Sequence, residues 1–160
     1  MKNCYKDASL LLIENTDLKK NIITGKLNCC NDCKFEIYHH SDLVKNIFNN
    51  YHFFQKESNN ELFIYAKCLK CGKTISIFNI KEDGYDNFYE KKFKSKQNLS
   101  TEPFKCLKCN KNDYNVKMLL EYPDEDFNGK INEKFTWIWI EITCNHCGKK
   151  YKNILNIETG

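Results

Sequence analysis

Residues 135–149 read FTWIWIEITCNHCGK, an alternating run of large apolar residues that ends in Cys144-Asn-His-Cys147 and Gly148. Alternation of this kind is typical of a β-strand with one buried face. The Cys-x-x-Cys spacing puts two thiols in one tight turn, where both can bind the same metal ion. The stretch therefore predicts a strand that ends in half of a metal site.

The Cys-x-x-Cys spacing occurs four times along the chain. The pairs are Cys30–Cys33, Cys68–Cys71, Cys106–Cys109 and Cys144–Cys147, and they contain eight of the ten cysteines. Their first members lie 38 residues apart. Cys29 is adjacent to Cys30, but only Cys30–Cys33 has the spacing of the other pairs. Four pairs in register predict two structural sites with four cysteines each.

The flanking residues indicate which pairs share a metal. The second and fourth pairs each follow a strand pattern and precede Gly-Lys, whereas the first and third pairs have neither feature. Residues 82–103 are polar and separate the second pair from the third. The predicted ligands are Cys30, Cys33, Cys68 and Cys71 in one site, and Cys106, Cys109, Cys144 and Cys147 in the other. Pairing across residues 82–103 is the alternative.

Zinc is the metal that we expect in both sites. Each cysteine quartet spans roughly 45 residues, which is too short for a hydrophobic core to stabilise the fold alone. Two Zn²⁺ ions would supply that stability, and iron is the less favoured metal. Disulfides require an oxidising compartment, and the apolar run at residues 10–13 is too short for a signal peptide. We therefore expect a reduced, cytoplasmic protein without a membrane span.

The arrangement of knuckles and strands resembles the zinc-ribbon superfamily, in which two Cys-x-x-Cys knuckles lie at the end of a three-stranded antiparallel sheet. The resemblance implies a mainly β, small α+β protein that contains two tandem zinc ribbons. The expected units are an N-terminal helical segment (1–26), zinc ribbon 1 (27–81), a linker (82–103) and zinc ribbon 2 (104–160). Zinc ribbons occur in transcription, ribosomal, enzyme-appended and interaction modules, so the resemblance predicts a fold and a metal without an activity.

Two helices are expected beside the sheets. Asp7 can cap a helix over residues 8–20. In residues 41–54, apolar side chains from Val44 to Tyr51 follow a helical spacing. The sequence therefore predicts an N-terminal helix and a short helical insertion in the first ribbon.

The charge of the chain argues against a strongly basic nucleic-acid-binding surface. The formal net charge is +4, and all 25 basic residues are lysines. Because a Zn²⁺ ion bound by four thiolates carries a net charge of −2, two such sites bring the total close to zero. Lysine cannot present the planar bidentate fork with which arginine reads guanine. The lysine-rich and asparagine-rich composition also indicates a host with low genomic GC content.

Two further stretches are candidates for contact with a partner. On the strand at 135–143, we expect the isoleucines to face the core and the aromatic residues to share the other face. That aromatic face is either buried between the two halves or forms a surface platform for bases or for a protein. An acidic stretch at a predicted hairpin tip would suit a basic partner. The candidate partner-binding residues are Phe135, Trp137, Trp139, Asp124, Glu125 and Asp126.

No residue pattern indicates catalysis. The sequence shows no Ser/His/Asp set and no phosphate-binding glycine loop, and a zinc ion with four cysteine ligands has no open position for a substrate. We therefore expect a non-enzymatic, zinc-stabilised protein that binds another protein, as an adaptor, an antitoxin-like protein or an immunity-type inhibitor. The alternative is a nucleic-acid-binding zinc-ribbon protein, such as a transcription or RNA accessory factor, because lysines surround the knuckles.

Overall fold

The computed structural model describes residues 1–54, 62–83, 102–125 and 127–159. Strands dominate these residues, so the prediction of a mainly β protein is confirmed. The helical elements in the described ranges are η1 (Ala8–Leu10) and α1 (Ile80–Asp83), and neither is long and apolar enough to cross a membrane. The strands are β1 (Lys2–Asn3), β2 (Leu11–Asp17), β3 (Ile22–Leu27), β4 (Phe35–His40), β5 (Asp42–Lys45), β6 (Tyr51–Phe54), β7 (Phe63–Cys68), β8 (Thr74–Asn79), β9 (Tyr114–Glu121), β10 (Trp137–Cys144) and β11 (Lys150–Glu158).

Nine of these strands form one sheet that contains two similar antiparallel units. The first unit is β4-β7-β8, and the second is β9-β10-β11. They meet where Phe35 of β4 pairs with Tyr114 of β9. β1 pairs with β8 in parallel, and the β2–β3 hairpin joins β9. The N-terminal strands therefore contact both units.

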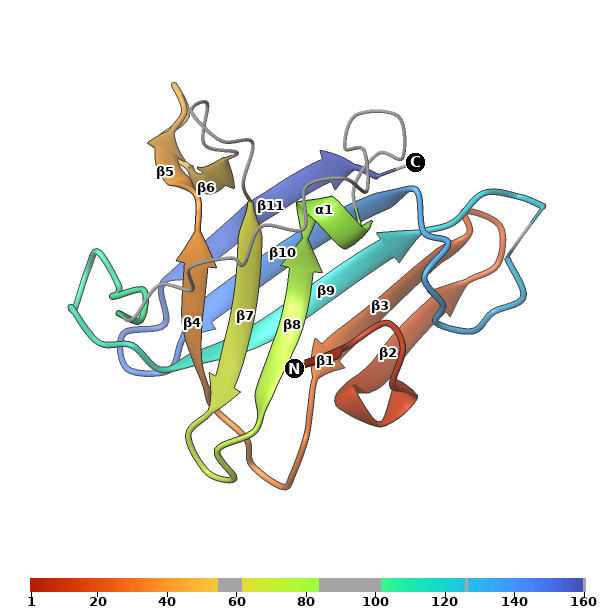
Figure 1. Ribbon diagram of the computed structural model, residues 1–160. Helices are drawn as coiled ribbons and strands as arrows, with labels where there is room; N and C mark the ends of the chain where they lie inside the picture. Colours follow the sequence, from red (N-terminus) through yellow and green to blue (C-terminus); the bar gives the residue numbers. More distant parts are fainter. Residues whose placement is uncertain (55–61, 84–101, 126, 160) are drawn as a thin grey trace.

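The core lies between the two units. In Figure 1, β4, β7 and β8 cross in front of β9, β10 and β11. Many of the side chains on the inner faces of both units are β-branched, and such side chains pack well on a pleated sheet. A contact of 4.0 Å joins Cys4 Sγ to Met118 Sδ, beside the carbonyl of Ile77 on β8. The core residues include Ile37, Ile64, Ala66, Ile75, Val116, Met118, Ile138, Ile140 and Ile142.

Residues 8–20 do not form the helix that the sequence predicts. The Asp7 carboxylate accepts a hydrogen bond from the Ser9 amide at 3.0 Å, but it caps only the short helix η1. The chain then extends as β2 and turns at Asp17, whose carboxylate accepts hydrogen bonds from two amides of the turn. Asn21 completes this turn with a φ of 57°. Pairing of β2 with β3, and of β3 with β9, overrides the helix propensity.

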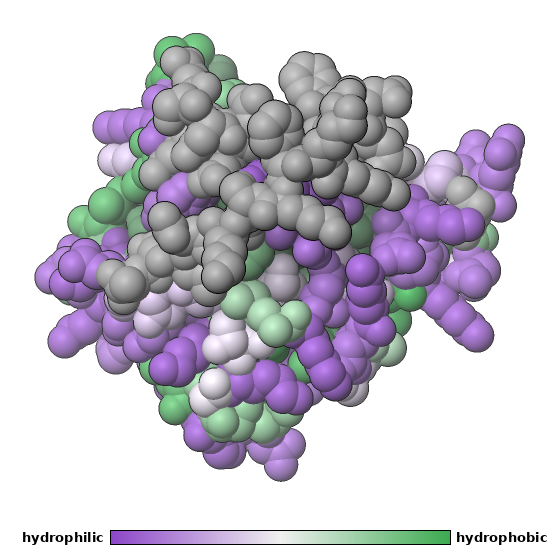
Figure 2. All heavy atoms as spheres, viewed as in Figure 1, coloured by the Kyte–Doolittle hydropathy of each residue, from purple (hydrophilic) through white to green (hydrophobic). Residues whose placement is uncertain are grey.

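Residues 41–54 form the β5–β6 hairpin instead of the predicted helix. The side chain of Asn46 accepts hydrogen bonds from two backbone amides of the turn, and Asn49 has a φ of 65°. These asparagines favour a turn over a helix. The turn exposes Ile47 (93%) and Phe48 (76%). In Figure 2, hydrophobic side chains gather at the upper left, where Figure 1 places this hairpin.

The predicted linker at 82–103 falls mostly outside the described residues. After the gap, the Phe104 amide donates a hydrogen bond to the Ile37 carbonyl at 2.6 Å. The Phe104 ring packs on Tyr114 and Tyr151 of the second unit, with ring centroids 5.7 and 5.3 Å away. Residues that follow the predicted linker therefore contact both units. The boundaries at 27, 81 and 104 stay predictions.

Candidate metal centres

Two groups of four cysteines lie close together in the described residues. Within each group, the sulfur atoms all lie within 4.8 Å of one another. Such groups can bind two metal ions, as the sequence predicts. The first centre comprises Cys29, Cys30, Cys68 and Cys71, and the second comprises Cys106, Cys109, Cys144 and Cys147.

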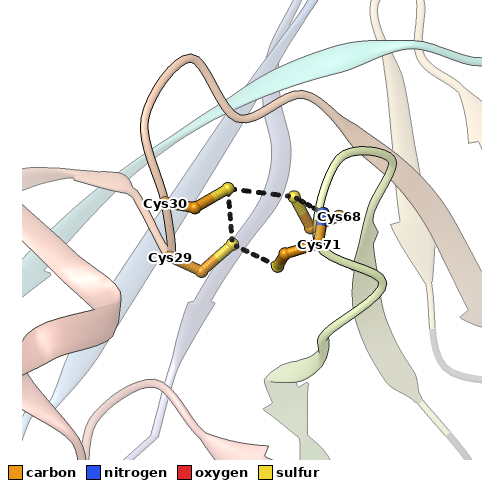
Figure 3. Close-up of side chains that lie close together, drawn as sticks. All are labelled: Cys29, Cys30, Cys68 and Cys71. Atoms are coloured by element: carbon orange, nitrogen blue, oxygen red, sulfur yellow. Dashed lines mark hydrogen bonds between the residues drawn. The ribbon is translucent and has the colours of Figure 1, made fainter.

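The spacing of the sulfur atoms suits a zinc-sized ion. A Zn–S bond is about 2.3 Å long, so the sulfurs of a tetrahedral site lie about 3.8 Å apart. In the second centre, Cys106 Sγ lies 3.6 Å from Cys147 Sγ, and Cys109 Sγ lies 3.5 Å from Cys144 Sγ. In the first centre, Cys29 Sγ lies 3.5 Å from Cys71 Sγ, and Cys30 Sγ lies 3.7 Å from Cys68 Sγ (Figure 3). The two sulfurs of the adjacent cysteines, Cys29 and Cys30, are 3.9 Å apart. Both groups therefore have the dimensions of a four-thiolate site.

Three knuckles share one backbone conformation. In each, the amide of the first cysteine donates to the carbonyl five residues later, and its own carbonyl accepts from the amide four residues later. The residue after the second cysteine is left-handed: Gly72 (φ 76°), Asn110 (φ 63°) or Gly148 (φ 74°). Glycine and asparagine adopt this region most easily. This turn directs both thiols of a knuckle into the same four-sulfur group.

The knuckle at residues 29–33 differs. The sequence predicts Cys30 and Cys33 as ligands, but the structure brings Cys29 and Cys30 into the first centre. The Cys33 sulfur lies 3.3 Å from the Asn28 side-chain oxygen and 3.9 Å from the Leu27 carbonyl. Sequence spacing alone gave no signal for Cys29, because Cys-x-x-Cys is the pattern of the other pairs.

One thiol in each group has a pKa below the usual value for cysteine. Burial raises the pKa of Cys68, but hydrogen bonds from the amides of Cys71 and Lys70 lower it to about 7. Burial likewise raises the pKa of Cys106, whereas the Tyr151 hydroxyl and two backbone amides lower it to about 6. Each centre therefore holds a thiol that becomes a thiolate, the metal-binding form, near neutral pH.

Among the described residues, a side-chain hydroxyl supports the second centre, and no hydroxyl does so in the first. The Tyr151 hydroxyl donates to Cys106 Sγ at 3.4 Å and accepts from the Leu107 amide at 2.8 Å. By strand register, the residue of the first unit that corresponds to Tyr151 is Ile75, which has no hydroxyl. His146 lies 3.5 Å from the Asp113 carboxylate, so it interacts beside the centre and outside the four-sulfur group.

The aromatic candidates divide into two environments. Trp137 and Trp139 are half-buried on the outer face of β10 and stack with ring centroids 5.4 Å apart. Phe135 does not share that face, which corrects the prediction. It is only 4% exposed and packs against Tyr5 at 4.5 Å. Alternation fails there because β10 begins at Trp137, so Phe135 precedes the strand.

The acidic candidates lie near the β2–β3 turn. Asp124 and Glu125 are exposed, and the Asn21 side-chain amide donates a hydrogen bond to the Asp124 carboxylate. Asp126 lies outside the described residues. The two described carboxylates are therefore accessible, and one of them is tied to the N-terminal strands.

Comparison with family models, with curated proteins and with solved structures found no match. The inferences that follow rest on the residues and on their geometry.

Proposed function

We propose that this is a non-enzymatic protein, stabilised by two Zn²⁺ ions, that binds another protein. Four thiolates complete the coordination of zinc and leave no position for a substrate or a reactive water. The knuckles and the three-stranded units support a pair of zinc-ribbon-like halves. Sites of free thiols suit a reducing compartment such as the cytoplasm.

A surface that carries large apolar side chains, two of them half-buried and two exposed, supports this proposal. It consists of the stacked Trp137 and Trp139, the neighbouring β11 residues, and the β5–β6 hairpin with Ile47 and Phe48 at its tip. We call it the hairpin face. The Trp137 ring nitrogen donates to the Asn156 side chain of β11 at 2.6 Å. Between β11 and the hairpin lies a hollow of about 290 Å³, whose lining includes Asn156. The tryptophan pair and the hairpin therefore belong to one continuous surface.

The tip of the β5–β6 hairpin is an ordered turn with two exposed apolar side chains. Hydrogen bonds to the Asn46 side chain hold the turn that exposes Ile47 and Phe48. Exposed apolar side chains that form a contiguous patch mark interaction sites, and Ile47 and Phe48 are neighbours at this tip. Because the turn is already ordered, little conformational entropy is lost when a partner covers it.

The charges beside the tryptophans favour a protein over a nucleic acid. Strand register places Glu121 and Glu158 on either side of Trp137. Glu141 follows on the same face of β10, opposite Lys117. Three carboxylates therefore lie beside the aromatic pair, and carboxylates repel phosphates. A protein partner with basic groups fits this surface, and the protein would then act as an adaptor, an antitoxin-like protein or an immunity-type inhibitor.

Affinity capture from the native host tests the proposal. The zinc-loaded protein is compared with an Ile47→Ser, Phe48→Ser variant. Loss of two contact side chains should reduce capture of a specific partner at least about tenfold, since 1.4 kcal/mol corresponds to a factor of ten. The matched control is Leu69→Ser, Leu107→Ser, which removes two half-exposed leucines from knuckles. Equal capture by both variants would contradict the role of the hairpin face.

Nucleic-acid binding is tested separately by titration with fluorescent single- and double-stranded DNA and RNA at two salt concentrations. Binding at micromolar concentrations that weakens steeply with salt would favour the nucleic-acid alternative. Both tryptophans of the chain lie on the hairpin face, so their emission also reports on a partner that binds to that face.

A further inference from the structure

The first metal centre has five neighbouring cysteines for four ligand positions. The loop between β3 and β4 carries Cys29, Cys30 and Cys33, whereas the loop before β9 carries only Cys106 and Cys109. Spacing alone cannot decide which two thiols of the first loop bind the metal. Strand register and sulfur geometry can decide it.

Strand register aligns the two loops. Phe35 pairs with Cys68, and Tyr114 pairs with Cys144. Phe35 and Tyr114 also pair with each other, so they hold equivalent places in the two units. Four residues separate Cys30 from Phe35, and four also separate Cys109 from Tyr114. Cys30 therefore takes the place of Cys109, and only one residue separates Cys33 from the strand.

The sulfur contacts give the same alignment. Cys30 Sγ lies 3.7 Å from Cys68 Sγ, as Cys109 Sγ lies 3.5 Å from Cys144 Sγ. In the same way, Cys29 Sγ lies 3.5 Å from Cys71 Sγ, as Cys106 Sγ lies 3.6 Å from Cys147 Sγ. Figure 3 shows the Cys29 and Cys30 side chains directed at Cys68 and Cys71. Cys29 therefore takes the place of Cys106.

The Cys33 sulfur lies outside the four-sulfur group and beside oxygen atoms. This sulfur is near two oxygen acceptors, the side chain of Asn28 and the carbonyl of Leu27, and only 7% of the residue is exposed. An S–H group can donate to such oxygens, whereas a metal-bound thiolate has no proton to donate. The left-handed residue also precedes Cys33, at Asp32, and does not follow it as in the other knuckles.

We propose that Cys29, and not Cys33, is the fourth ligand of the first centre. The centre is then closed by an adjacent Cys29-Cys30 pair in place of a Cys-x-x-Cys knuckle. Cys33 remains a free, buried thiol beside a metal centre. This assignment depends on metal binding and is independent of the partner-binding surface, so a failed capture experiment would not affect it.

Cobalt substitution tests the assignment. The wild-type protein, Cys29→Ser and Cys33→Ser are each loaded with Co²⁺, and thiolate-to-cobalt absorption is measured with the metal content. Cys33→Ser should bind two ions with wild-type absorption. Cys29→Ser should lose about an eighth of the absorption if serine still coordinates, and about half if the first ion is lost, because four of the eight ligands belong to that centre. The reverse pattern, or wild-type absorption in both variants, would overturn the proposal.

Chemical labelling covers the case in which Cys29→Ser fails to fold. The wild-type, zinc-loaded protein is incubated for a long period with N-ethylmaleimide and then digested with trypsin. Cleavage after Lys26 and Lys34 gives a peptide of residues 27–34, which holds all three cysteines of the loop. Label on Cys33 with Cys29 protected supports the proposal. Label on Cys29 with Cys33 protected would refute it.

Discussion

The two metal centres have similar sulfur geometry but different support. Contacts of 3.5 to 3.9 Å join the sulfurs in both. The second centre has two regular knuckles and a tyrosine hydroxyl on one sulfur, whereas the first has one regular knuckle and an adjacent cysteine pair. Different backbone routes can thus produce the same tetrahedron. The difference predicts that the second centre holds its metal more tightly.

The largest expected effect comes from removing both metals. Structural zinc contributes on the order of 10 kcal/mol in small domains, so excess chelator should unfold the protein. The loss of sheet structure is measured by circular dichroism. Chelator titration also ranks the centres, because the first ion should leave before the second. Simultaneous release, or a folded metal-free protein, would contradict the comparison.

Removing one ligand should affect both halves. Cys68→Ser and Cys144→Ser each disrupt one centre, but the two units share one core and meet at the Phe35–Tyr114 pair. We expect each variant to unfold in a single transition at a lower temperature than the wild type. Differential scanning calorimetry measures this. Two separate transitions would show that the halves fold independently, as a tandem arrangement would require.

Tyr151→Phe should make the second centre resemble the first. It removes the hydroxyl that donates to Cys106 Sγ and accepts from the Leu107 amide. The expected cost is about 1–2 kcal/mol, with roughly a tenfold loss of metal affinity, measured by competition with a chromophoric chelator. Tyr114→Phe is the matched control, since the buried Tyr114 hydroxyl has no hydrogen-bond partner among the described residues. Equal effects of both substitutions would indicate packing alone.

The smallest effect is a pH dependence of the unfolding free energy that comes from one carboxylate, Asp83, at the end of the first unit. Burial raises the pKa of Asp83 to about 6, although the Asn79 amide and the Asn3 side chain hydrogen-bond to its carboxylate. The folded state then binds this proton more tightly than the unfolded state. The stabilisation that comes from protonated Asp83 is complete below about pH 4 and is lost as the pH rises through 6.

When the pH falls from 7.5 to 5, the free energy of unfolding of the wild-type protein should therefore rise by about 1 kcal/mol relative to that of Asp83→Asn. Urea unfolding of both zinc-loaded proteins at the two pH values measures the difference. Parallel changes in the two proteins would show that other groups are responsible.

Local patterns of the sequence identified only part of the fold. The alternation in β10 correctly placed Ile138, Ile140 and Ile142 in the core. The helical spacing at 41–54 failed because the asparagines of the turn decide that segment. Residues 8–20 failed for a different reason, because their structure depends on pairing with strands far along the chain.

The candidate sites, like the fold, were predicted only in part from local patterns. Cysteine spacing predicted two groups, and the structure brings seven of the eight predicted ligands together. The position of Cys29 follows from the register of β4 against β7 and β9, which no local pattern contains. Phe135 likewise left the aromatic face because the strand begins two residues later. The exposed hairpin tip was missed because its apolar residues matched a helix.

The pairing of β3 with β9 has a consequence for synthesis of the chain. The closest partners in this pair, Lys26 and Lys117, are 91 residues apart. At translation rates of 5–20 residues per second, β3 waits roughly 5 to 18 seconds for its partner strand to be made. During that interval, the nascent chain exposes an unpaired strand edge and the side chain of Ile23, which is buried in the final structure. The last strands to leave the ribosome therefore complete a sheet that the first ones began.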